Sequence, residues 1–310
     1  MVDVVIAGAG PAGLNAALMF GRAQRPTLVC DTGEPRNAPV HAMHGFLSRD
    51  GLDPAELRRI SREQLARYPS VEVRDIAITE ARPDGQRFIV RLGDGGEMSA
   101  RRLVLATGVV DELPAVEGLA EYWGHGVFNC PYCDGWEVRN KPLAVLGGDM
   151  MNVFLALSLV RWSEDVTLCT NGETVTDEGM LHLLTSRKIP VRDERLIRVN
   201  GNGDALQELV FAEGLPLPRR AMFHHPRTRQ RSGLPAQLGC SLLDDGSVSV
   251  DDLGLTDVQG VYAVGDMARR PAMPFPGAQV VIAAAEGAVA ALFIDQELLF
   301  DDLATIGAAK

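Results

Sequence analysis

Gly8-Ala9-Gly10-Pro11-Ala12-Gly13 follows an apolar run, residues 2–7, and opens a helical pattern. A strand, a glycine-rich turn and a helix in this order form the setting in which the pattern G-x-G-x-x-G binds a dinucleotide. Gly8 allows the tight turn, Gly10 lets the backbone approach a pyrophosphate, and Gly13 lets the helix pack closely on the strand. The phosphates are expected at the N-terminus of the helix, where the helix dipole favours anions.

A second strand, residues 27–30, ends in Asp31. A carboxylate at this point can accept a hydrogen bond from a ribose hydroxyl, and it favours a dinucleotide site over a coincidental glycine turn. The layout recurs about 140 residues later, where strand 143–146 leads through Gly147-Gly148 into an apolar helix from Asn152 to about Val160. The chain is therefore expected to be an α/β protein with two Rossmann-like domains.

The stretch Asn129-Cys130-Pro131-Tyr132-Cys133-Asp134-Gly135-Trp136 indicates redox chemistry. Cys130 and Cys133 are spaced so that they can close a small disulfide ring and reopen it, which stores two electrons. The carboxyl group of Asp134 can give a proton to a departing thiolate or take one from a thiol. The alternative is half of a structural zinc site, but the sequence has no second Cys-x-x-Cys pair to complete it, so no metal is expected.

Composition restricts the partners and the compartment. The chain has 310 residues, enough for two domains, and 41 acidic against 30 basic residues, which argues against nucleic acid or an anionic membrane as the main partner. Gln279 and Glu286 interrupt the most apolar late stretch, residues 278–294, and the N-terminal residues lack the features of a signal peptide. Five cysteines without the spacing of a disulfide framework favour a reducing compartment. We expect a cytoplasmic protein without a membrane span.

Six features occur in an order that resembles the low-molecular-weight thioredoxin reductase family of flavoproteins. They are Gly8 to Gly13, Asp31, Ala106-Thr107-Gly108, Cys130 to Asp134, the strand end Tyr262 to Asp266, and Gln279-Val280. The resemblance spans essentially the whole chain and implies an FAD-binding domain built from residues 1–112 and 247–310. It implies that a second Rossmann-like domain, residues 113–246, is inserted in the first and carries the cysteine pair. It also implies FAD as the cofactor and a homodimer as the assembly.

The resemblance further assigns roles to single residues. Cys130 would attack the substrate, Cys133 would face the flavin, and Asp134 would be the acid and base. The residues expected to bind FAD are Gly8, Gly10, Pro11, Ala12, Gly13, Asp31, Asn37, His44, Ala106, Thr107, Gly108, Gly265, Asp266, Gln279 and Val280. The expected substrate is a thioredoxin-like protein or a small disulfide or dithiol.

The second dinucleotide turn departs from the family pattern. Gly147-Gly148-Asp149-Met150-Met151-Asn152 has Asp149 in place of the second fingerprint glycine, and Asn152 where the third position requires Gly or Ala. A carboxylate at position 149 would block the close approach of a pyrophosphate and repel its charge. The family's Arg-rich stretch for a 2′-phosphate is also absent, although Glu173 could accept from a ribose hydroxyl and allow weak NADH binding. We therefore expect no conventional NADPH site.

Several alternatives stay open. The turn could be shifted in register with Asp149 pointing outward, which would make the chain an ordinary NAD(P)H-dependent thioredoxin reductase. Without an NADPH site, electrons could arrive from another carrier, such as ferredoxin or a second flavin. They could also leave to oxygen, which would make the chain an oxidase of small dithiols, as some relatives in natural-product pathways are. A further alternative is a redox sensor that binds FAD without turnover.

Residues 219–231 contain five arginines and no acidic residue. In an acidic chain, such a segment could dock an acidic electron carrier. A solvated loop is the other explanation.

Overall fold

The computed structural model describes residues 1–308, which form two compact units. Unit 1 consists of residues 1–38, 54–110 and 228 onward, and unit 2 of residues 39–53 and 111–227. The chain leaves unit 1 through β7 (Val109–Glu112) and returns through β16 (Arg227–Gln230), and these two strands pair with each other.

The units differ from the ranges expected from the sequence at two places. Residues 228–246 lie in unit 1, because Leu234, Leu238 and Cys240 are buried in its core. Residues 39–53 lie in unit 2, where Pro39 packs against the backbone of Gly124.

Unit 1 is built on a seven-stranded sheet with the strand order β3-β2-β1-β6-β5-β4, in which β18 also pairs with β6. The strands are β1 (Val2–Ala7), β2 (Thr27–Cys30), β3 (Val71–Arg74), β4 (Ile78–Asp84), β5 (Arg87–Leu92), β6 (Glu97–Leu105) and β18 (Val261–Ala263). Strands β3, β2, β1, β6 and β18 are parallel neighbours, whereas β4 and β5 pair antiparallel. The segments that follow the parallel strands therefore meet at one edge of the sheet.

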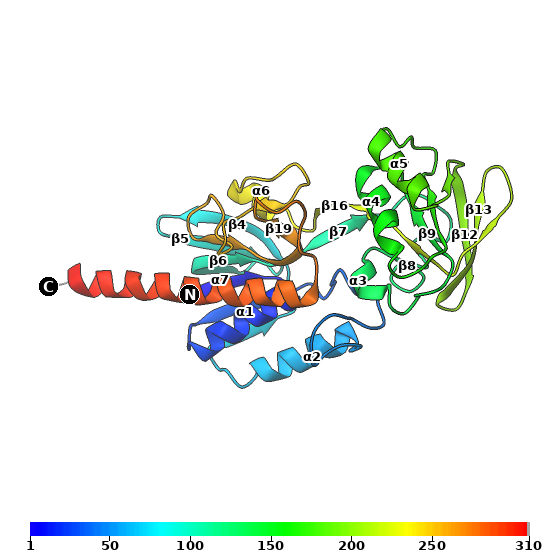
Figure 1. The fold of residues 1–310 in the computed structure, drawn as a ribbon. Coiled ribbons are helices and arrows are strands. Elements are labelled where there is room, and N and C mark those ends of the chain that lie inside the picture. The colour runs from blue at the N-terminus through cyan, green and yellow to red at the C-terminus, as the bar shows by residue number, and fades with distance from the viewer. Residues whose placement is uncertain (309–310) are drawn as a thin grey trace. The chain divides into compact units, whose positions relative to one another are not determined.

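Both faces of this sheet are covered, which explains why β1 is an uninterrupted apolar run. Val4 and Ile6 belong to the core cluster that includes α1 and α7, and Val5 and Ala7 belong to the cluster on the other face. Figure 1 shows α7 running alongside α1. The other elements of unit 1 complete the list: α1 (Pro11–Arg22), α2 (Pro54–Leu65), α6 (Leu234–Leu238), β17 (Val248–Ser249), η1 (Gly265–Met267), β19 (Ala268–Arg269) and α7 (Val280–Ala308).

The long helix α7 is fixed to the sheet by ion pairs as well as by apolar packing. Arg25 lies 2.6 Å from Asp295, and Arg102 lies 2.9 Å from Asp301. Within the described part of the chain, no helix is both long and apolar enough to cross a bilayer.

Unit 2 contains a five-stranded parallel sheet with the order β11-β10-β9-β15-β8. Its helices pack on one face, and a three-stranded sheet packs on the other. The elements are β8 (Val127–Phe128), α3 (Pro131–Asp134), β9 (Leu143–Leu146), α4 (Met150–Leu159), β10 (Val166–Cys169), α5 (Glu178–Ser186), β11 (Val191–Arg192), β12 (Leu196–Asn202), β13 (Ala205–Phe211), β14 (Leu217–Pro218) and β15 (Ala221–Phe223). The predicted α/β fold, with one Rossmann-like unit inserted in another, is confirmed.

We predict that Gly287→Ala destabilises unit 1. A Cβ at this position of α7 would overlap the backbone carbonyl oxygen of Ala12 in α1, so the two helices would have to separate. Overpacking of this kind costs about 1–3 kcal/mol. Urea unfolding followed by circular dichroism should show a lower midpoint for Gly287→Ala. The matched control is Gly233→Ala, whose Cβ would meet only the side chain of Gln237, at 3.8 Å. Equal midpoints for the two variants would contradict the close approach of α1 and α7.

Candidate active site

The turn between β1 and α1 has little space at Gly8 and Gly13, where the helix packs on the strand. It has free space at Gly10, where a phosphate is expected. Gly8 has φ +106°, and a Cβ there would overlap the carbonyl oxygen of Ala106. A Cβ at Gly13 would overlap the carbonyl oxygen of Gly8. A Cβ at Gly10, in contrast, would have no described atom within 4 Å outside its own chain neighbours. This cradle fits the pyrophosphate of FAD.

The N-terminus of α1 leaves backbone donors for a ligand. Gly10 is the N-cap residue and Pro11 follows it, and within the described residues no side chain caps this helix. The first amides of an α-helix have no partner inside the helix and favour an anion. The residues of the turn therefore suit a phosphate without rearrangement.

Asp31 lies directly beside this turn. One carboxylate oxygen accepts a hydrogen bond from the amide of Ala9 at 3.0 Å, and the other lies 3.0 Å from the guanidinium of Arg62 in α2. Arg58, one helical turn earlier in α2, lies 3.8 Å from the same carboxylate. The side chain is thus held in place at the end of β2, where its predicted role is to bind the adenosine ribose.

Two further predicted FAD-binding segments meet at the same sheet edge. Thr107 follows β6, and its hydroxyl donates to the sulfur of Met267 at 3.4 Å, which joins Ala106-Thr107-Gly108 to the turn after β18. Gly265 in that turn has φ +76°, and a Cβ there would lie 3.2 Å from the Cβ of Ala12.

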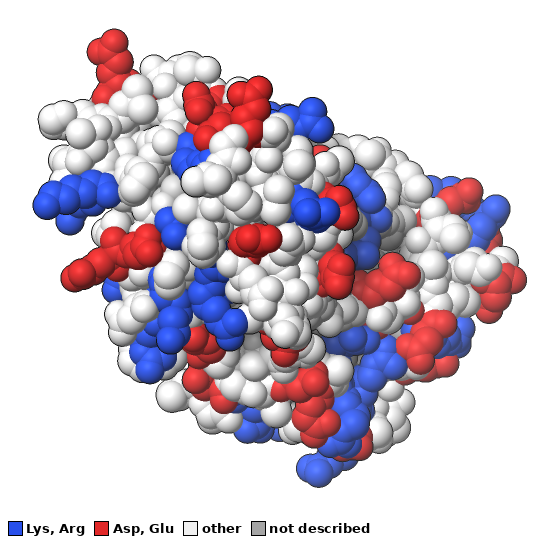
Figure 2. Space-filling model, turned by 90° about the vertical axis from the view of Figure 1, so that its right-hand side faces the viewer, with Lys and Arg blue, Asp and Glu red and all other residues white. Residues whose placement is uncertain are grey.

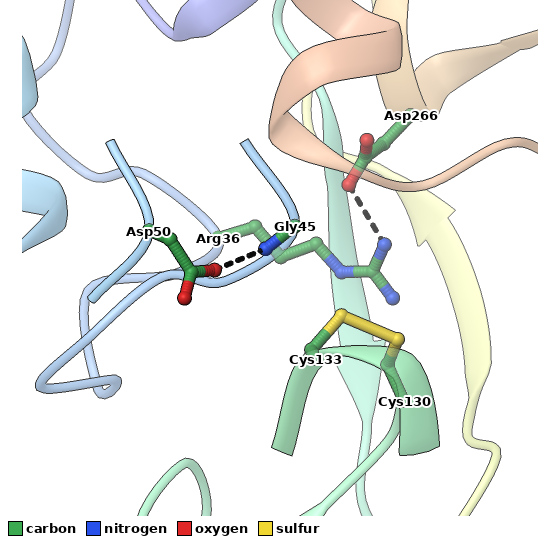
Figure 3. Close-up of a disulfide and its surroundings, with 6 residues drawn as sticks. All are labelled: Arg36, Gly45, Asp50, Cys130, Cys133 and Asp266. Carbon is green, nitrogen blue, oxygen red and sulfur yellow. Dashed lines mark hydrogen bonds and ion pairs between the residues drawn. A yellow bond between two sulfur atoms is a disulfide. The ribbon is translucent and has the colours of Figure 1, made fainter. Parts of the chain in front are cut away.

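Arg36 and Glu286 were not found by sequence reasoning, although both hold predicted FAD-binding residues. Arg36 donates to Asp266 at 2.8 Å (Figure 3), and Glu286 of α7 accepts from the amide of Gly265 at 2.8 Å. Burial raises the pKa of Glu286. No spacing or motif distinguished either residue, because each contact joins segments far apart in the sequence.

The remaining FAD-binding predictions are distributed over both units. Gln279 and Val280 stand at the start of α7, where the amide of Ala283 donates to the carbonyl of Gln279 at 2.9 Å. Asn37 lies half-buried in unit 1, whereas His44 lies in unit 2. Their roles toward FAD stay predictions.

The cysteine pair lies at the end of β8 in unit 2. Cys130 and Cys133 form a disulfide with their Cα atoms 5.3 Å apart, drawn in Figure 3. Cys130 has extended backbone dihedrals and caps the single turn α3, in which Pro131 occupies the first position. Pro131 suits that position because the first amides of a helix are unpaired in any case. The described residues contain no group of three or more His, Cys, Asp or Glu side chains arranged to hold a metal.

The other three cysteines are buried and unsuited to exchange. Burial raises the pKa of the Cys30 thiol to about 11 and that of the Cys169 thiol to about 12, and it also raises the pKa of Cys240. Thiols with such pKa values carry little thiolate, which is the nucleophilic form.

Asp134 lies at the end of α3, and the pKa of its carboxyl group is raised. Burial raises the pKa of its carboxyl group to about 7; the nearby carboxylate of Glu137 adds to this increase, and His44 opposes it. A carboxyl group with this pKa is present in both protonation states at neutral pH, so it can take a proton from a thiol or return one.

The turn after β9 repeats the turn after β1 in its backbone. Its first glycine, Gly147, has φ +116°, against +106° at Gly8. The next amide donates to Glu173 at 2.6 Å, as the corresponding amide in unit 1 donates to Asp31 at 3.0 Å. The expected register is therefore present, and Asp149 takes the place of the second glycine.

Asp149 caps its own helix. One carboxylate oxygen accepts from the amides of Met151 at 2.9 Å and Asn152 at 3.2 Å, and the other accepts from Asn152 Nδ2 at 2.6 Å. Asn152 is fully buried, and its side-chain oxygen accepts from the amide of His225 at 2.7 Å. The carboxylate of Asp149 is thus bonded to the first turn of α4, and its side chain is exposed. Whether the turn binds a nucleotide stays a prediction.

Comparison with known proteins identifies the family. A family model described as pyridine nucleotide-disulphide oxidoreductase matches residues 2–290. The chain belongs to this family. Thioredoxin reductase tcpT of Claviceps purpurea is 33% identical over 280 residues, which cover 86% of each chain. The crystal structure of HlmI is 39% identical with a TM-score of 0.92, covering 99% of this chain and 96% of that one. An oxidoreductase from Agrobacterium tumefaciens is 35% identical with a TM-score of 0.89, covering 96% and 99%. The chain is an FAD-dependent disulfide oxidoreductase of the thioredoxin reductase type.

In this thioredoxin reductase-like enzyme, the arginines of residues 219–231 are divided between the two units. Arg219 lies 3.2 Å from Asp165 in unit 2, and Arg231 lies 3.5 Å from Glu34 in unit 1. Figure 2 shows basic and acidic side chains interspersed over the face it presents. Docking of an acidic carrier stays a prediction.

We predict that reduction of the Cys130–Cys133 disulfide by dithiothreitol follows the ionisation of Asp134. The rate should rise with pH through about 7, the pKa of this carboxyl group, because only the carboxylate can accept the thiol proton. Asp134→Asn should lower the rate by about 10²- to 10⁴-fold, as expected for loss of a general base. Stopped-flow measurement under anaerobic conditions checks both. An unchanged rate in the variant would remove Asp134 from the chemistry.

Proposed function

We propose that this enzyme exchanges two electrons between FAD and a protein or small-molecule disulfide through Cys130 and Cys133, without a conventional NADPH site in unit 2. The observation that best supports this proposal is that the carboxylate of Asp149 accepts hydrogen bonds at the N-terminus of α4. The donor would be another carrier, such as ferredoxin or a second flavin, and the assembly a homodimer.

Hydrogen bonding and charge both support the proposal that the turn at Asp149 does not bind a pyrophosphate. A pyrophosphate would have to displace the carboxylate that already binds the amides of Met151 and Asn152. If Asp149 stayed in place, two like charges about 4 Å apart would cost about 1–4 kcal/mol. That range corresponds to about a fivefold to thousandfold loss of affinity.

The residues around the disulfide define the exchange step. A substrate thiol gives its proton to Asp134, and its sulfur attacks Cys130, so that the bond to Cys133 breaks and Cys133 leaves as a thiolate. A second substrate thiol, whose proton passes to the thiolate of Cys133, then attacks the mixed disulfide and releases Cys130, which takes up the proton held by Asp134. The substrate becomes a disulfide and the pair becomes two thiols, with two electrons transferred. In the reductive direction the same steps run backward, with Asp134 as the acid. FAD, when bound, supplies the two-electron partner of this pair.

A second candidate function is oxidation of small dithiols, with oxygen as the final acceptor. A dithiol would lose two electrons and two protons to become a disulfide, and oxygen would take them up as hydrogen peroxide. Asp134 favours this candidate, because a carboxyl group with a pKa of about 7 is largely available as a base for thiols at slightly alkaline pH. The dithiol would be its own electron source, so the closed turn at Asp149 would not limit it.

We predict that anaerobic mixing with excess NADPH leaves the flavin oxidised on the timescale of turnover, whereas dithiothreitol bleaches it. A redox sensor would instead bind FAD and show no multiple turnover with any dithiol or disulfide supplied. Rapid bleaching by NADPH would defeat the proposal and return the chain to the ordinary reductases.

Restoring the fingerprint should create a nucleotide site. In the double variant Asp149→Gly, Asn152→Ala, the first amides of α4 become free, and we expect NADH affinity to rise by about fivefold to thousandfold. NADH is the expected ligand because Glu173 remains beside the turn. Calorimetric titration measures this gain. Asp177→Gly is the matched control, since Asp177 caps α5 in the same unit and its replacement by glycine, as at Asp149, costs about a few tenths of a kcal/mol of stability. Equal NADH affinity in the double variant and the control would contradict the blocking role of Asp149.

A further inference from the structure

The loop that carries His44 is closed by hydrogen bonds within unit 2. The amide of Met43 donates to the carbonyl of Leu52 at 2.9 Å, and Met43 is buried. The amide of Gly45 donates to Asp50 at 2.9 Å, as drawn in Figure 3. His44 therefore stands on a closed loop between two anchored neighbours.

Two carboxylates lie at opposite ends of the His44 ring. Nδ1 is 3.4 Å from Asp50, and Nε2 is 3.7 Å from Glu137. The side chain of His44 is 19% exposed, whereas that of His41 on the same loop is 72% exposed. An imidazolium presents an N–H donor to both carboxylates, which a neutral ring cannot do.

Glu137 lies three residues after Asp134, the last residue of α3. The contact between His44 and Glu137 therefore joins the loop of residues 39–53 to the segment that follows α3. The two neighbours act on Asp134 in opposite directions. Glu137 raises the pKa of Asp134, and His44 lowers it.

We infer that His44 is a positioning residue for thiol–disulfide exchange: held between Asp50 and Glu137, it sets how readily Asp134 gives up its proton. The reacting atoms are the substrate sulfur, the sulfurs of the pair and the carboxyl of Asp134, and His44 acts only through that carboxyl.

The same two segments carry few other charges. Arg49 donates to the carbonyl of Ser48 at 3.0 Å, and Arg139 donates to the carbonyl of Trp136 at 2.6 Å. The other charged residues of the ranges 39–53 and 131–139, apart from His44, Asp50, Asp134 and Glu137, are Asp53 and the exposed His41.

The test is the pH dependence of reduction of the holoenzyme by dithiothreitol, measured anaerobically in a set of single variants. In this reaction the first thiol of dithiothreitol loses its proton to Asp134 and attacks Cys130, and Cys133 leaves. The rate of each variant is divided by the rate of the same variant with Asp134→Asn added. This cancels the part of the pH dependence that comes from ionisation of dithiothreitol. The quotient isolates the step that depends on Asp134.

His44→Gln should move the midpoint of this quotient to higher pH, because the favourable interaction of the ring with the carboxylate of Asp134 is lost. Glu137→Gln should move it to lower pH, because an anion that disfavours the carboxylate is lost. His41→Gln is the matched control, since His41 lies 3.5 Å from the exposed Asp204 and should leave the midpoint unchanged.

Shifts of opposite sign in the two variants support the inference, and a purely structural role for His44 would not produce them. An unchanged midpoint in His44→Gln, with wild-type FAD content and melting temperature, overturns it. If His44→Gln fails to fold, Glu137→Gln provides the test. A midpoint in Glu137→Gln that is unchanged or moves to higher pH also overturns the inference. The inference rests on the proposed exchange at Cys130 and Cys133 with Asp134 as base, and not on the closed turn at Asp149. Flavin bleaching by NADPH would therefore defeat the proposal of a missing NADPH site and leave this test intact.

Discussion

The first amides of a helix that follows a parallel strand need an acceptor, and what supplies it differs between the two units. In unit 1, Gly10 leaves these amides of α1 to a ligand, and the surrounding glycines are shaped to admit one. In unit 2, Asp149 supplies a carboxylate from the turn itself, and Asn152 fills the space beneath it. The same backbone turn thus leaves the first helical amides without a side-chain cap in one unit and caps them with a carboxylate in the other.

The disulfide and the capped turn of unit 2 lie at the same edge of one sheet. The disulfide follows β8, and the capped turn follows β9, so both stand at the carboxyl ends of parallel strands in one sheet. The chemistry needs a proton acceptor with a pKa near neutrality, and burial gives Asp134 that property. Charged neighbours shift the pKa of this carboxyl group in both directions: Glu137 raises it and His44 lowers it.

Much of the fold could be read from local patterns, because buried parallel strands are continuous apolar runs and the fingerprint glycines mark the turn after them. Strand 143–146 is found as predicted, and α4 begins two residues before the expected helix start at Asn152. The charge at Asp149 was visible in the sequence, but its hydrogen-bond partners were not. Contacts such as Arg36 to Asp266, or His44 to Glu137, join distant segments, and no local pattern encodes them.

The central claim is that one nucleotide-binding turn accepts a ligand and the other is closed by its own carboxylate. Native mass spectrometry of the purified protein in excess NADPH tests it most directly. The account predicts a mass equal to the chain with one FAD bound and no added nicotinamide nucleotide. A stoichiometric NADPH adduct on the flavin-bound chain, or a chain that carries no flavin, would contradict it.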